Sequence, residues 1–396
     1  MTYNGESGAT PETAPRGWQS LSEIFATTAP LLAKLLYLPG YEFSSNIYAL
    51  TDGDVTLIDP GNDYTAYMEL WKLGFKPGDI KKIVLTHGHL DHAMGALELL
   101  RSYPRILETG GFGLIVHEAS PRQIKEGMRE AGMRVTEVRG GEQLDLSGFA
   151  WEVIHTPGHT IDGICLYHAP SKTVITGDTV LPHAMAEPDT NAGGRLDHYL
   201  MGIRALLTKQ VENVLPGHGL PIAGVGRQVI EQTYESLMMK VLNLEEQTPW
   251  MVAAMALVEK GLLPEGLFCC DKALALNPAD GSALELKALC LNDLGSFQEA
   301  LAILDQLAAL RPQAGDVSAL LARGYALMGI GQYDQSIALF DQVLDLKPGL
   351  TDALVYKGMA LYLSGNYEGA MQIEPFQKEF VARFRDELLK RRGPST

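Results

Sequence analysis

The chain has 396 residues, of which 46% are hydrophobic and 20% are charged. This length exceeds what one compact core commonly supports, so it indicates two or three domains, and the apolar content excludes a wholly disordered chain. The 48 acidic and 32 basic residues leave a net charge of −16, which argues against a general binder of nucleic acids or of anionic membranes. Four cysteines are too few and too clustered for a disulfide framework, so we expect a cytoplasmic protein.

The N-terminal segment, residues 1–20, is polar and contains acidic residues. It has no apolar core of the kind found in a signal peptide, and we expect a flexible tail. The longest apolar stretch that follows, residues 24–38, is interrupted by Pro30 and Lys34 and is too short to span a bilayer. No membrane partner is therefore expected.

From about residue 41 to residue 220, short β-branched segments alternate with helical segments across Gly, Pro and Asp turns. Residues 55–58 and 82–85 are typical of the strands, and residues 64–73 are typical of the helices. This alternation predicts an α/β or layered α+β domain, which we place at residues 21–245. All ten histidines of the chain lie at or before His218. Because histidine is the commonest metal ligand and general base, we expect the chemistry in this domain.

The densest group of candidate metal ligands follows the predicted strand at 82–85 and reads HGHLDH. It holds three histidines and one carboxylate within six residues: His87, His89, Asp91 and His92. Such a loop at a strand end suits two metal ions a few ångströms apart. A chance histidine-rich surface loop would explain HxH alone, but it does not explain HxHxDH directly after an apolar strand.

Three further candidate ligands each follow an apolar segment and a Gly-containing turn. They are His159 in TPGHT, Asp178 in TGDT and His218 in PGHG. Each is weak alone, but with the HGHLDH loop they form four clusters in order, each at a predicted strand end. Asp59, in IDPG, closes another predicted strand. This carboxylate either orients a metal ligand by hydrogen bonding or simply starts a turn.

After about residue 245 the sequence becomes rich in Ala and Leu and repeats itself. Prolines recur 34 and 36 residues apart, and glycines recur at spacings of 34, 36 and 34: Pro278, Pro312 and Pro348, and Gly261, Gly295, Gly331 and Gly365. The pattern resembles tetratricopeptide repeats, which are helix–turn–helix units, and a generic helical bundle would not keep turn residues in phase. We place about four units at residues 246–377. The last unit is atypical, because Glu374 stands where the repeat has a large apolar residue.

The order of Asp59, HxHxDH, TPGHT, TGDT and PGHG resembles the metallo-β-lactamase fold superfamily over roughly residues 30–245. The resemblance implies an α+β fold, an αββα sandwich with a metal site at one edge between two sheets, here followed by an all-α repeat solenoid. It also implies a ligand set: His87, His89 and His159 for the first metal, Asp91, His92 and His218 for the second, and Asp178 bridging the two. Imidazole and carboxylate ligands suit two Zn²⁺ ions best, with Mn²⁺ or Fe²⁺ as alternatives.

By the same resemblance, a hydroxide that bridges the metals attacks the carbonyl of a small-molecule substrate, an ester, a lactone or a thioester, and Asp91 accepts a hydrogen bond from the attacking water. The segment after Asp178 is similar to lactamase-β-like hydrolases of broad substrate range. There His183, His198 and Tyr199 are candidates for lining a substrate pocket and donating protons, or else they belong to a solvent-facing loop and helix start. Glyoxalase II-like thioesterases share the ligands, although their C-terminal substrate-binding region is replaced here by repeats.

Three other functions remain open. A mononuclear iron enzyme similar to persulfide dioxygenases has the same spacing of 19 residues between His159 and Asp178. A nuclease or phosphodiesterase fits the family, but residues 1–245 carry 19 basic and 29 acidic side chains, so a nucleic-acid partner is not favoured. The protein could also be a scaffold that acts mainly through its repeats.

The repeats are expected to bind a peptide or protein partner, to pair two chains, or to cover the active site. Residues 246–377 carry 7 basic and 16 acidic side chains, so a bound peptide is expected to be basic. The remaining residues, 378–396, are basic and amphipathic and are expected to form a C-terminal helix or tail.

Overall fold

The computed structural model describes residues 17–391 apart from residues 110, 183–184, 246 and 312–315. Most of the predicted tail at residues 1–20 therefore lies outside the described residues. The chain divides into two compact units, residues 1–241 and 242–396, which we describe in turn. Within the described residues, no helix is both long enough and apolar enough to cross a membrane.

The first unit contains two β-sheets, of which the larger has seven strands that are neighbours in chain order. These strands are β1 (Gln19–Ser20), β2 (Leu35–Leu38), β3 (Ile47–Asp52), β4 (Asp54–Ile58), β5 (Ile80–Val84), β6 (Gly113–His117) and β7 (Arg134–Val138). Strands β1 to β4 pair antiparallel, and β4 to β7 pair parallel. The smaller sheet has the order β12-β11-β10-β9-β8. Its strands are β8 (Gln143–Leu146), β9 (Phe149–His155), β10 (Ile164–His168), β11 (Thr173–Gly177) and β12 (Asn213–Pro216), and only β11 and β12 pair parallel.

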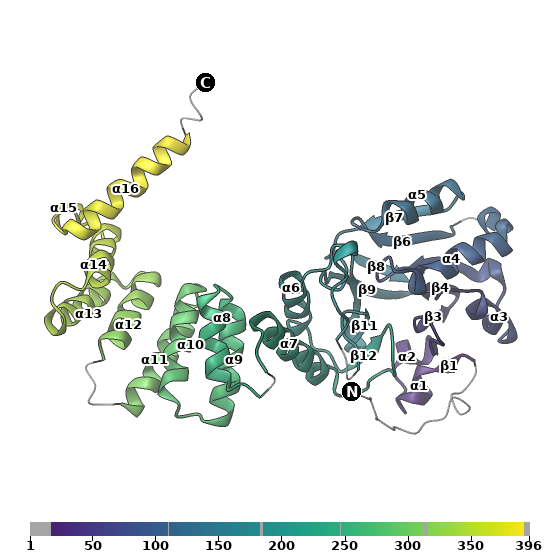
Figure 1. The fold of residues 1–396 in the computed structure, drawn as a ribbon, viewed down its shortest axis with the longest axis horizontal. Coiled ribbons are helices and arrows are strands. Elements are labelled where there is room, and N and C mark those ends of the chain that lie inside the picture. The colour runs from purple at the N-terminus through teal and green to yellow at the C-terminus, as the bar shows by residue number, and fades with distance from the viewer. Residues whose placement is uncertain (1–16, 110, 183–184, 246, 312–315, 392–396) are drawn as a thin grey trace, which may run out of the picture. The chain divides into compact units, whose positions relative to one another are not determined.

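The two sheets pack face to face through an apolar core. Ile58 and Val84 of the larger sheet lie in one buried cluster with Trp151 and Leu166 of the smaller sheet. Apolar residues that alternate with these point to the other face of the larger sheet and pack under helices. The helices of this unit are α1 (Leu21–Ile24), α2 (Pro30–Lys34), α3 (Thr65–Lys72), α4 (Leu90–Ser102), α5 (Arg122–Glu130), α6 (Leu196–Leu207) and α7 (Gly226–Leu242). Helices α3 and α4 cover the larger sheet, and α6 contacts β9 on the other side (Figure 1). The layers are therefore helix, sheet, sheet and helix, which confirms the predicted sandwich.

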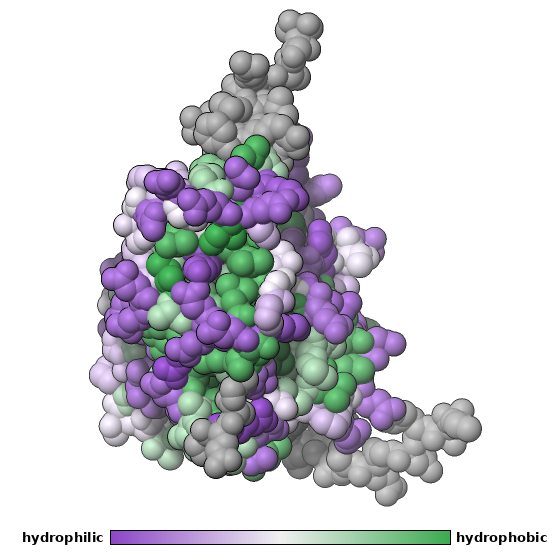
Figure 2. All heavy atoms as spheres, turned by 90° about the vertical axis from the view of Figure 1, so that its left-hand side faces the viewer, coloured by the Kyte–Doolittle hydropathy of each residue, from purple (hydrophilic) through white to green (hydrophobic). Residues whose placement is uncertain are grey.

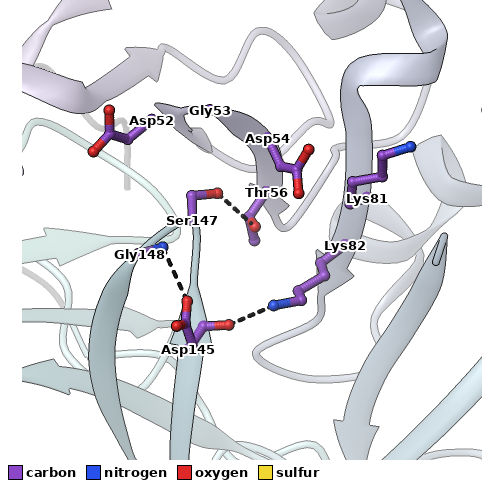
Figure 3. Close-up of a pocket in the computed structure, with 9 residues that line it drawn as sticks. All are labelled: Asp52, Gly53, Asp54, Thr56, Lys81, Lys82, Asp145, Ser147 and Gly148. Atoms are coloured by element: carbon purple, nitrogen blue, oxygen red, sulfur yellow. Dashed lines mark hydrogen bonds between the residues drawn. The ribbon is translucent and has the colours of Figure 1, made fainter.

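One polar hollow of about 330 Å³ lies between the turn that joins β3 to β4 and the turn that joins β8 to β9 (Figure 3). Its lining includes three acidic and two basic residues: Asp52, Asp54, Asp145, Lys81 and Lys82. The Lys82 ammonium donates to the backbone carbonyl of Asp145 at 2.5 Å. Asp54 begins β4, whereas Asp59 follows its end, so this hollow lies at the opposite end of the strand from the candidate ligands.

The second unit is built from pairs of helices, as the repeats predict. They are α8 (Trp250–Glu259), α9 (Leu263–Leu276), α10 (Gly281–Asp293), α11 (Phe297–Leu310), α12 (Val317–Gly329), α13 (Tyr333–Leu346), α14 (Thr351–Leu363), α15 (Tyr367–Met371) and α16 (Glu374–Arg391). Consecutive helices pack against each other along the chain. The view in Figure 2 shows apolar side chains gathered among polar ones on one face of the molecule. Exposed Leu346, Leu363 and Tyr367 are among the large apolar residues on the surface of this unit.

The last repeat keeps its packing although its second helix is broken. In the third repeat, Phe340 of α13 packs against Gly324, where an added β-carbon would lie 2.6 Å from the ring. In the fourth repeat, Phe376 of α16 packs against Gly358 in the same way, at 2.4 Å from such a β-carbon. The chain is interrupted between α15 and α16, so the apolar residue arrives two positions later than Glu374. Helix α16 thus takes the place of the missing second helix.

Charged pairs connect each repeat to the next at equivalent positions. Lys287, Arg323 and Lys357, on the first helices of successive repeats, pair with Asp271, Asp305 and Asp341 on the preceding second helices. All three pairs are at least partly exposed, so each contributes little to stability, about 0–1 kcal/mol.

Candidate metal centre

The seven candidate ligands all lie at carboxyl ends of strands or in the loops that follow. His87 comes after β5, and His89 is the residue that precedes the first turn of α4. Asp91 and His92 lie within that first turn, because α4 begins at Leu90. His159 lies between β9 and β10, Asp178 follows β11, and His218 follows β12. Both sheets therefore deliver ligands to one edge of the sandwich.

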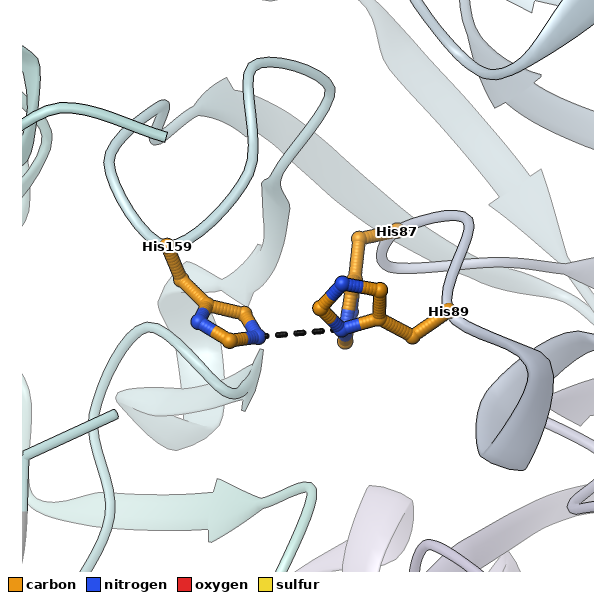
Figure 4. A group of neighbouring side chains, drawn as sticks. All are labelled: His87, His89 and His159. Atoms are coloured by element: carbon orange, nitrogen blue, oxygen red, sulfur yellow. Dashed lines mark hydrogen bonds between the residues drawn. The ribbon is translucent and has the colours of Figure 1, made fainter. Parts of the chain in front are cut away.

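Three histidines form the first group (Figure 4). His89 Nδ1 lies 3.0 Å from His87 Nε2 and 3.0 Å from His159 Nε2. His87 is buried, whereas His89 and His159 are partly exposed. The three nitrogens therefore face one another between one buried and two partly exposed rings.

Asp91, His92 and His218 form the second group. The Asp91 carboxylate lies 3.1 Å from His218 Nε2 and 3.5 Å from His92 Nε2. Asp178 lies between the two groups. Its two carboxylate oxygens are 3.5 Å from His92 Nε2, 3.6 Å from His218 Nε2 and 3.7 Å from His159 Nε2. The structure thus brings all seven predicted ligands together.

Hydrogen bonds to the far side of each ring determine which nitrogen faces the cluster. The Thr86 hydroxyl donates to Asp59 at 2.6 Å, so its oxygen accepts from His87 Nδ1 at 3.1 Å. His159 Nδ1 donates to the backbone carbonyl of Glu187 at 2.6 Å. Both rings are therefore left with an unprotonated Nε2 that points inward.

The same logic applies to His89 and His92. His89 Nε2 donates to the Asp189 carboxylate at 3.1 Å, which leaves Nδ1 unprotonated. His92 Nδ1 donates to Asp59 at 2.8 Å, which directs Nε2 toward the cluster. Metal-binding histidines characteristically use such partners to hold the ring and the tautomer.

The residues present fit a pair of divalent cations. Among the described residues, neither His92 Nε2 nor Asp178 Oδ1 has a hydrogen-bond partner, although both atoms are buried and lie 3.5 Å apart. An unsatisfied buried polar atom costs about 1–3 kcal/mol, so two facing each other need an explanation. One cation between His92 Nε2 and Asp178 Oδ1 would give both atoms a partner. A second cation would do the same for the three converging nitrogens of the first group.

The electrostatics of the cluster keep several ligands in their metal-binding forms. Burial lowers the pKa of His87 and of His159, so both rings are neutral near pH 7. Burial raises the pKa of Asp178, but the charge of the neighbouring His92 outweighs burial and holds that pKa well below its ordinary value. Burial lowers the pKa of His92, but the charges of Asp59 and Asp178 outweigh burial and raise it, so a bound cation would displace a proton from this ring. Neutral imidazoles and ionised carboxylates are the forms that bind metals.

Asp59 lies where it was predicted to act. Its side chain is 2% exposed, and its second oxygen accepts from the backbone N–H of Thr86 at 2.7 Å. One carboxylate therefore holds His92 directly and His87 through Thr86. Its backbone φ of +51° is unusual for a residue other than glycine, and places the carboxylate at the strand end.

The other predicted pocket residues have different outcomes. Tyr199 does not line an open pocket, because its side chain is fully buried and its hydroxyl donates to the backbone carbonyls of Asp178 and Thr179 at 3.0 and 2.9 Å. Tyr199 therefore supports the backbone at Asp178. His198 is half-buried near the start of α6, and His183 lies outside the described residues. Sequence reasoning gave no role to Asp189, whose only signal is an acidic residue in the loop before α6.

The fold and the edge cluster define a sandwich domain with a candidate two-metal centre, and comparison with known families agrees. The model of the metallo-beta-lactamase superfamily matches residues 40–218, and the model of the tetratricopeptide repeat matches residues 251–315 and 321–374. The chain therefore joins a metallo-β-lactamase superfamily domain to tetratricopeptide repeats.

Individual relatives are distant. An atrochrysone carboxyl ACP thioesterase from a Cryptosporiopsis species is 25% identical over 217 residues, which cover 54% of this chain and 61% of the relative. A lactamase-like protein from Pestalotiopsis microspora is 27% identical over 153 residues, 39% of this chain and 41% of the relative. The matched parts are thus well under two thirds of either relative. Among solved structures, a metallo-beta-lactamase family protein from Thermus thermophilus is 23% identical with a TM-score of 0.41, and the match covers 56% of this chain and 86% of that protein.

Proposed function

We propose that residues 21–245 catalyse metal-dependent hydrolysis of an ester or thioester, and that residues 246–377 bind a protein partner. One observation carries the catalytic part: five imidazoles and two carboxylates converge, and two of their buried atoms, His92 Nε2 and Asp178 Oδ1, have no hydrogen-bond partner among the described residues. The match to the metallo-beta-lactamase superfamily and the similarity to atrochrysone carboxyl ACP thioesterases support the same reaction class.

His87, His89 and His159 would hold one divalent cation, Asp91, His92 and His218 a second, and Asp178 would contact both. Such cations lower the pKa of bound water toward neutrality and polarise a substrate carbonyl oxygen. Zinc fits the donor set best. The described residues supply the remaining requirements of the reaction: they orient the ligands and keep the second group partly dry, since His92 is fully buried.

Asp91 is the residue we assign to accept the proton or hydrogen bond of the attacking water. Burial raises the pKa of Asp91, but the hydrogen bond from His218 and the charge of His92 outweigh burial. The net pKa is below its ordinary value, so the carboxyl is ionised at neutral pH. Its side chain is 31% exposed, in contrast to the fully buried His92 beside it. A carboxylate that is ionised and open to solvent can receive a proton from substrate water.

The chemistry of the substrate follows from the acidity of the protein. With 19 basic and 29 acidic side chains in residues 1–245, a polyanionic substrate such as RNA is disfavoured. An uncharged ester, lactone or thioester fits better. For the repeats, the balance of 7 basic and 16 acidic side chains in residues 246–377 favours a basic peptide as the partner.

The test begins with the metal content of the purified full chain, followed by a panel of ester, lactone, thioester, phosphodiester and β-lactam substrates. We expect two zinc ions per chain, turnover of esters or thioesters, and loss of turnover after chelation that added zinc restores. Asp178→Ala should abolish turnover, whereas Asp54→Ala, a carboxylate at the opposite end of β4, should not. One iron with oxygen consumption would instead indicate a dioxygenase, and no metal with no turnover would leave only a scaffold.

A further inference from the structure

We propose that Asp189 is a positioning residue that determines the affinity of the first metal group, through His89, independently of the second group. This inference rests on the proposed function, since it concerns the same two-metal centre. It assigns a role to residues 187–195, which precede α6 and include none of the seven candidate ligands.

Asp189 contacts the face of His89 that lies away from the cluster. Its Oδ2 lies 3.1 Å from His89 Nε2, and the opposite ring nitrogen, Nδ1, is the atom that meets His87 and His159. A carboxylate that accepts the distal N–H orients the ring and makes the inward nitrogen more basic, and both effects strengthen metal binding. The other oxygen of Asp189 accepts from the backbone N–H of Asn191 at 2.9 Å, which holds the carboxylate in place.

The backbone around Asp189 also fixes the loop of His159. The N–H of Asp189 donates to the carbonyl of His159 at 2.8 Å, and the N–H of Arg195 donates to the carbonyl of Gly158 at 2.9 Å. On the other side of the ligand, the N–H of Ile161 donates to the carbonyl of Ala192 at 2.9 Å. Residues 189–195 are thus attached to the His159 loop at three points.

Glu187 completes the arrangement. Its backbone carbonyl accepts from His159 Nδ1 at 2.6 Å, while its side-chain carboxylate pairs with Lys240 of α7. Two of the three rings of the first group are therefore oriented by one short segment, residues 187–189. The third ring, His87, is oriented by Thr86.

The second group is supported by residues outside segment 187–195. His92 Nδ1 donates to Asp59 at 2.8 Å, and the backbone carbonyl of Asp91 accepts from the N–H of Ser45 at 3.1 Å. Among the described residues, the hydrogen bonds of segment 187–195 reach His89 and the His159 loop and do not reach this group. A change at Asp189 should therefore act on one metal and spare the other.

The experiment measures both zinc dissociation constants of the full chain by competition with a chromophoric chelator, for the wild type and for three variants. Asp189→Ala removes the contact with His89. Asp189→Asn keeps an oxygen for the turn at Asn191 but removes the charge. Asp197→Asn is the matched control, because this nearby exposed carboxylate pairs with Arg195 and not with a ligand.

We expect Asp189→Ala to raise the dissociation constant of one of the two zinc ions by about 10–100-fold, the usual range when a residue that hydrogen-bonds a metal ligand is lost. The dissociation constant of the other zinc ion should not change. The affected dissociation constant of Asp189→Asn should lie between those of the wild type and Asp189→Ala. Both constants of Asp197→Asn should equal those of the wild type. The melting temperature of the metal-free protein should be the same for Asp189→Asn and the wild type, which separates positioning from general destabilisation.

Two further variants identify the affected site. In a His159→Ala background, which already disables the first group, Asp189→Ala should cause no additional loss, whereas in a His218→Ala background the loss should persist. Equal weakening of both ions, or no weakening of either, overturns the inference while leaving the proposed function intact. A wild type that takes up no zinc overturns the proposed function and this inference together.

Discussion

Gly217 lies directly against the carboxylate of Asp178. A β-carbon at residue 217 would lie 2.3 Å from Asp178 Oδ1 and 2.8 Å from Cε1 of His92, closer than such atoms approach in proteins. The backbone N–H of Gly217 also donates to the carbonyl of Gly177 at 2.7 Å. The parallel pair β11 and β12 therefore brings backbone, rather than a side chain, to the centre of the cluster.

Gly217→Ala should displace Asp178 and weaken metal binding without unfolding the domain. We expect zinc content per chain to fall and turnover to drop at least about 10-fold, a loss comparable to that of an outer-shell partner. Zinc content and circular dichroism of the same preparation check both parts. Gly127→Ala in α5 is a control of the same chemical change, because this glycine is helical and a β-carbon there would meet nothing within 4 Å. Unchanged zinc content in Gly217→Ala would show that the cluster tolerates the displacement.

Asp178→Asn should lower kcat by more than about 100-fold, beyond the usual effect of losing an outer-shell partner. Asparagine keeps the size of the side chain but loses the charge that lies beside His92, His159 and His218. Steady-state kinetics with the best substrate of the panel measure this. Retention of wild-type turnover would contradict a centre in which Asp178 contacts both metals.

Tyr199→Phe should reduce the free energy of unfolding by about 1–3 kcal/mol, because two buried backbone carbonyls lose their donor. Since the hydroxyl is fully buried and contacts Asp178 and Thr179 only through their backbone, kcat should change by a few-fold at most. Urea unfolding and kinetics on one preparation separate the two effects. A large loss of kcat with unchanged stability would instead indicate that the Tyr199 hydroxyl acts in catalysis.

Phe376→Ala should destabilise the repeat unit by about 3–5 kcal/mol, the usual cost of truncating a buried phenylalanine. This ring is 4% exposed and fills the space beside Gly358. Val381→Ala on the same helix is the control, because Val381 is exposed. We expect Phe376→Ala to lose its helical signal at a lower urea concentration than the wild type, whereas Val381→Ala should not. Equal behaviour of the two variants would show that α16 does not act as the second helix of the last repeat.

The four cysteines should resist thiol reagents in the native protein at pH 8. All four are buried, and burial raises the pKa of Cys165 and of Cys270 to about 12 and that of Cys290 to about 11. A raised pKa leaves less thiolate, the reactive form, at any pH below it. In the unfolded chain the thiols ionise near pH 8.5, so unfolding releases protons above that pH and the cysteines make stability fall as pH rises. Labelling with a chromogenic disulfide should be slow in buffer and should reach four thiols in denaturant.

The candidate ligands could be predicted from the sequence because each follows an apolar segment, and strand ends in a sandwich meet at one edge. The hydrogen bonds that orient these ligands could not be predicted from the sequence. Asp189 is 100 residues from His89, so no local pattern links the two, and the tautomer of His89 depends on that contact.

The errors have equally physical causes. The resemblance to lactamase-β-like hydrolases made Tyr199 a candidate for lining a pocket, but the helical turn points its side chain to the buried face of α6. Glu374 indicated an atypical last repeat, but a fixed period could not identify Phe376, two positions later, as the residue that fills the expected apolar position. A break between two helices shifts the register, and only packing against Gly358 reveals it.

The charged pairs between repeats have the same chemistry at every junction: an aspartate on the outgoing helix and a lysine or arginine on the incoming one. An ion pair of this kind is therefore available to any two of these repeats placed next to each other. Removing the whole third repeat would put Asp305 and Lys357 at equivalent positions of the new junction. A shortened array would thus keep matched charges between its remaining repeats.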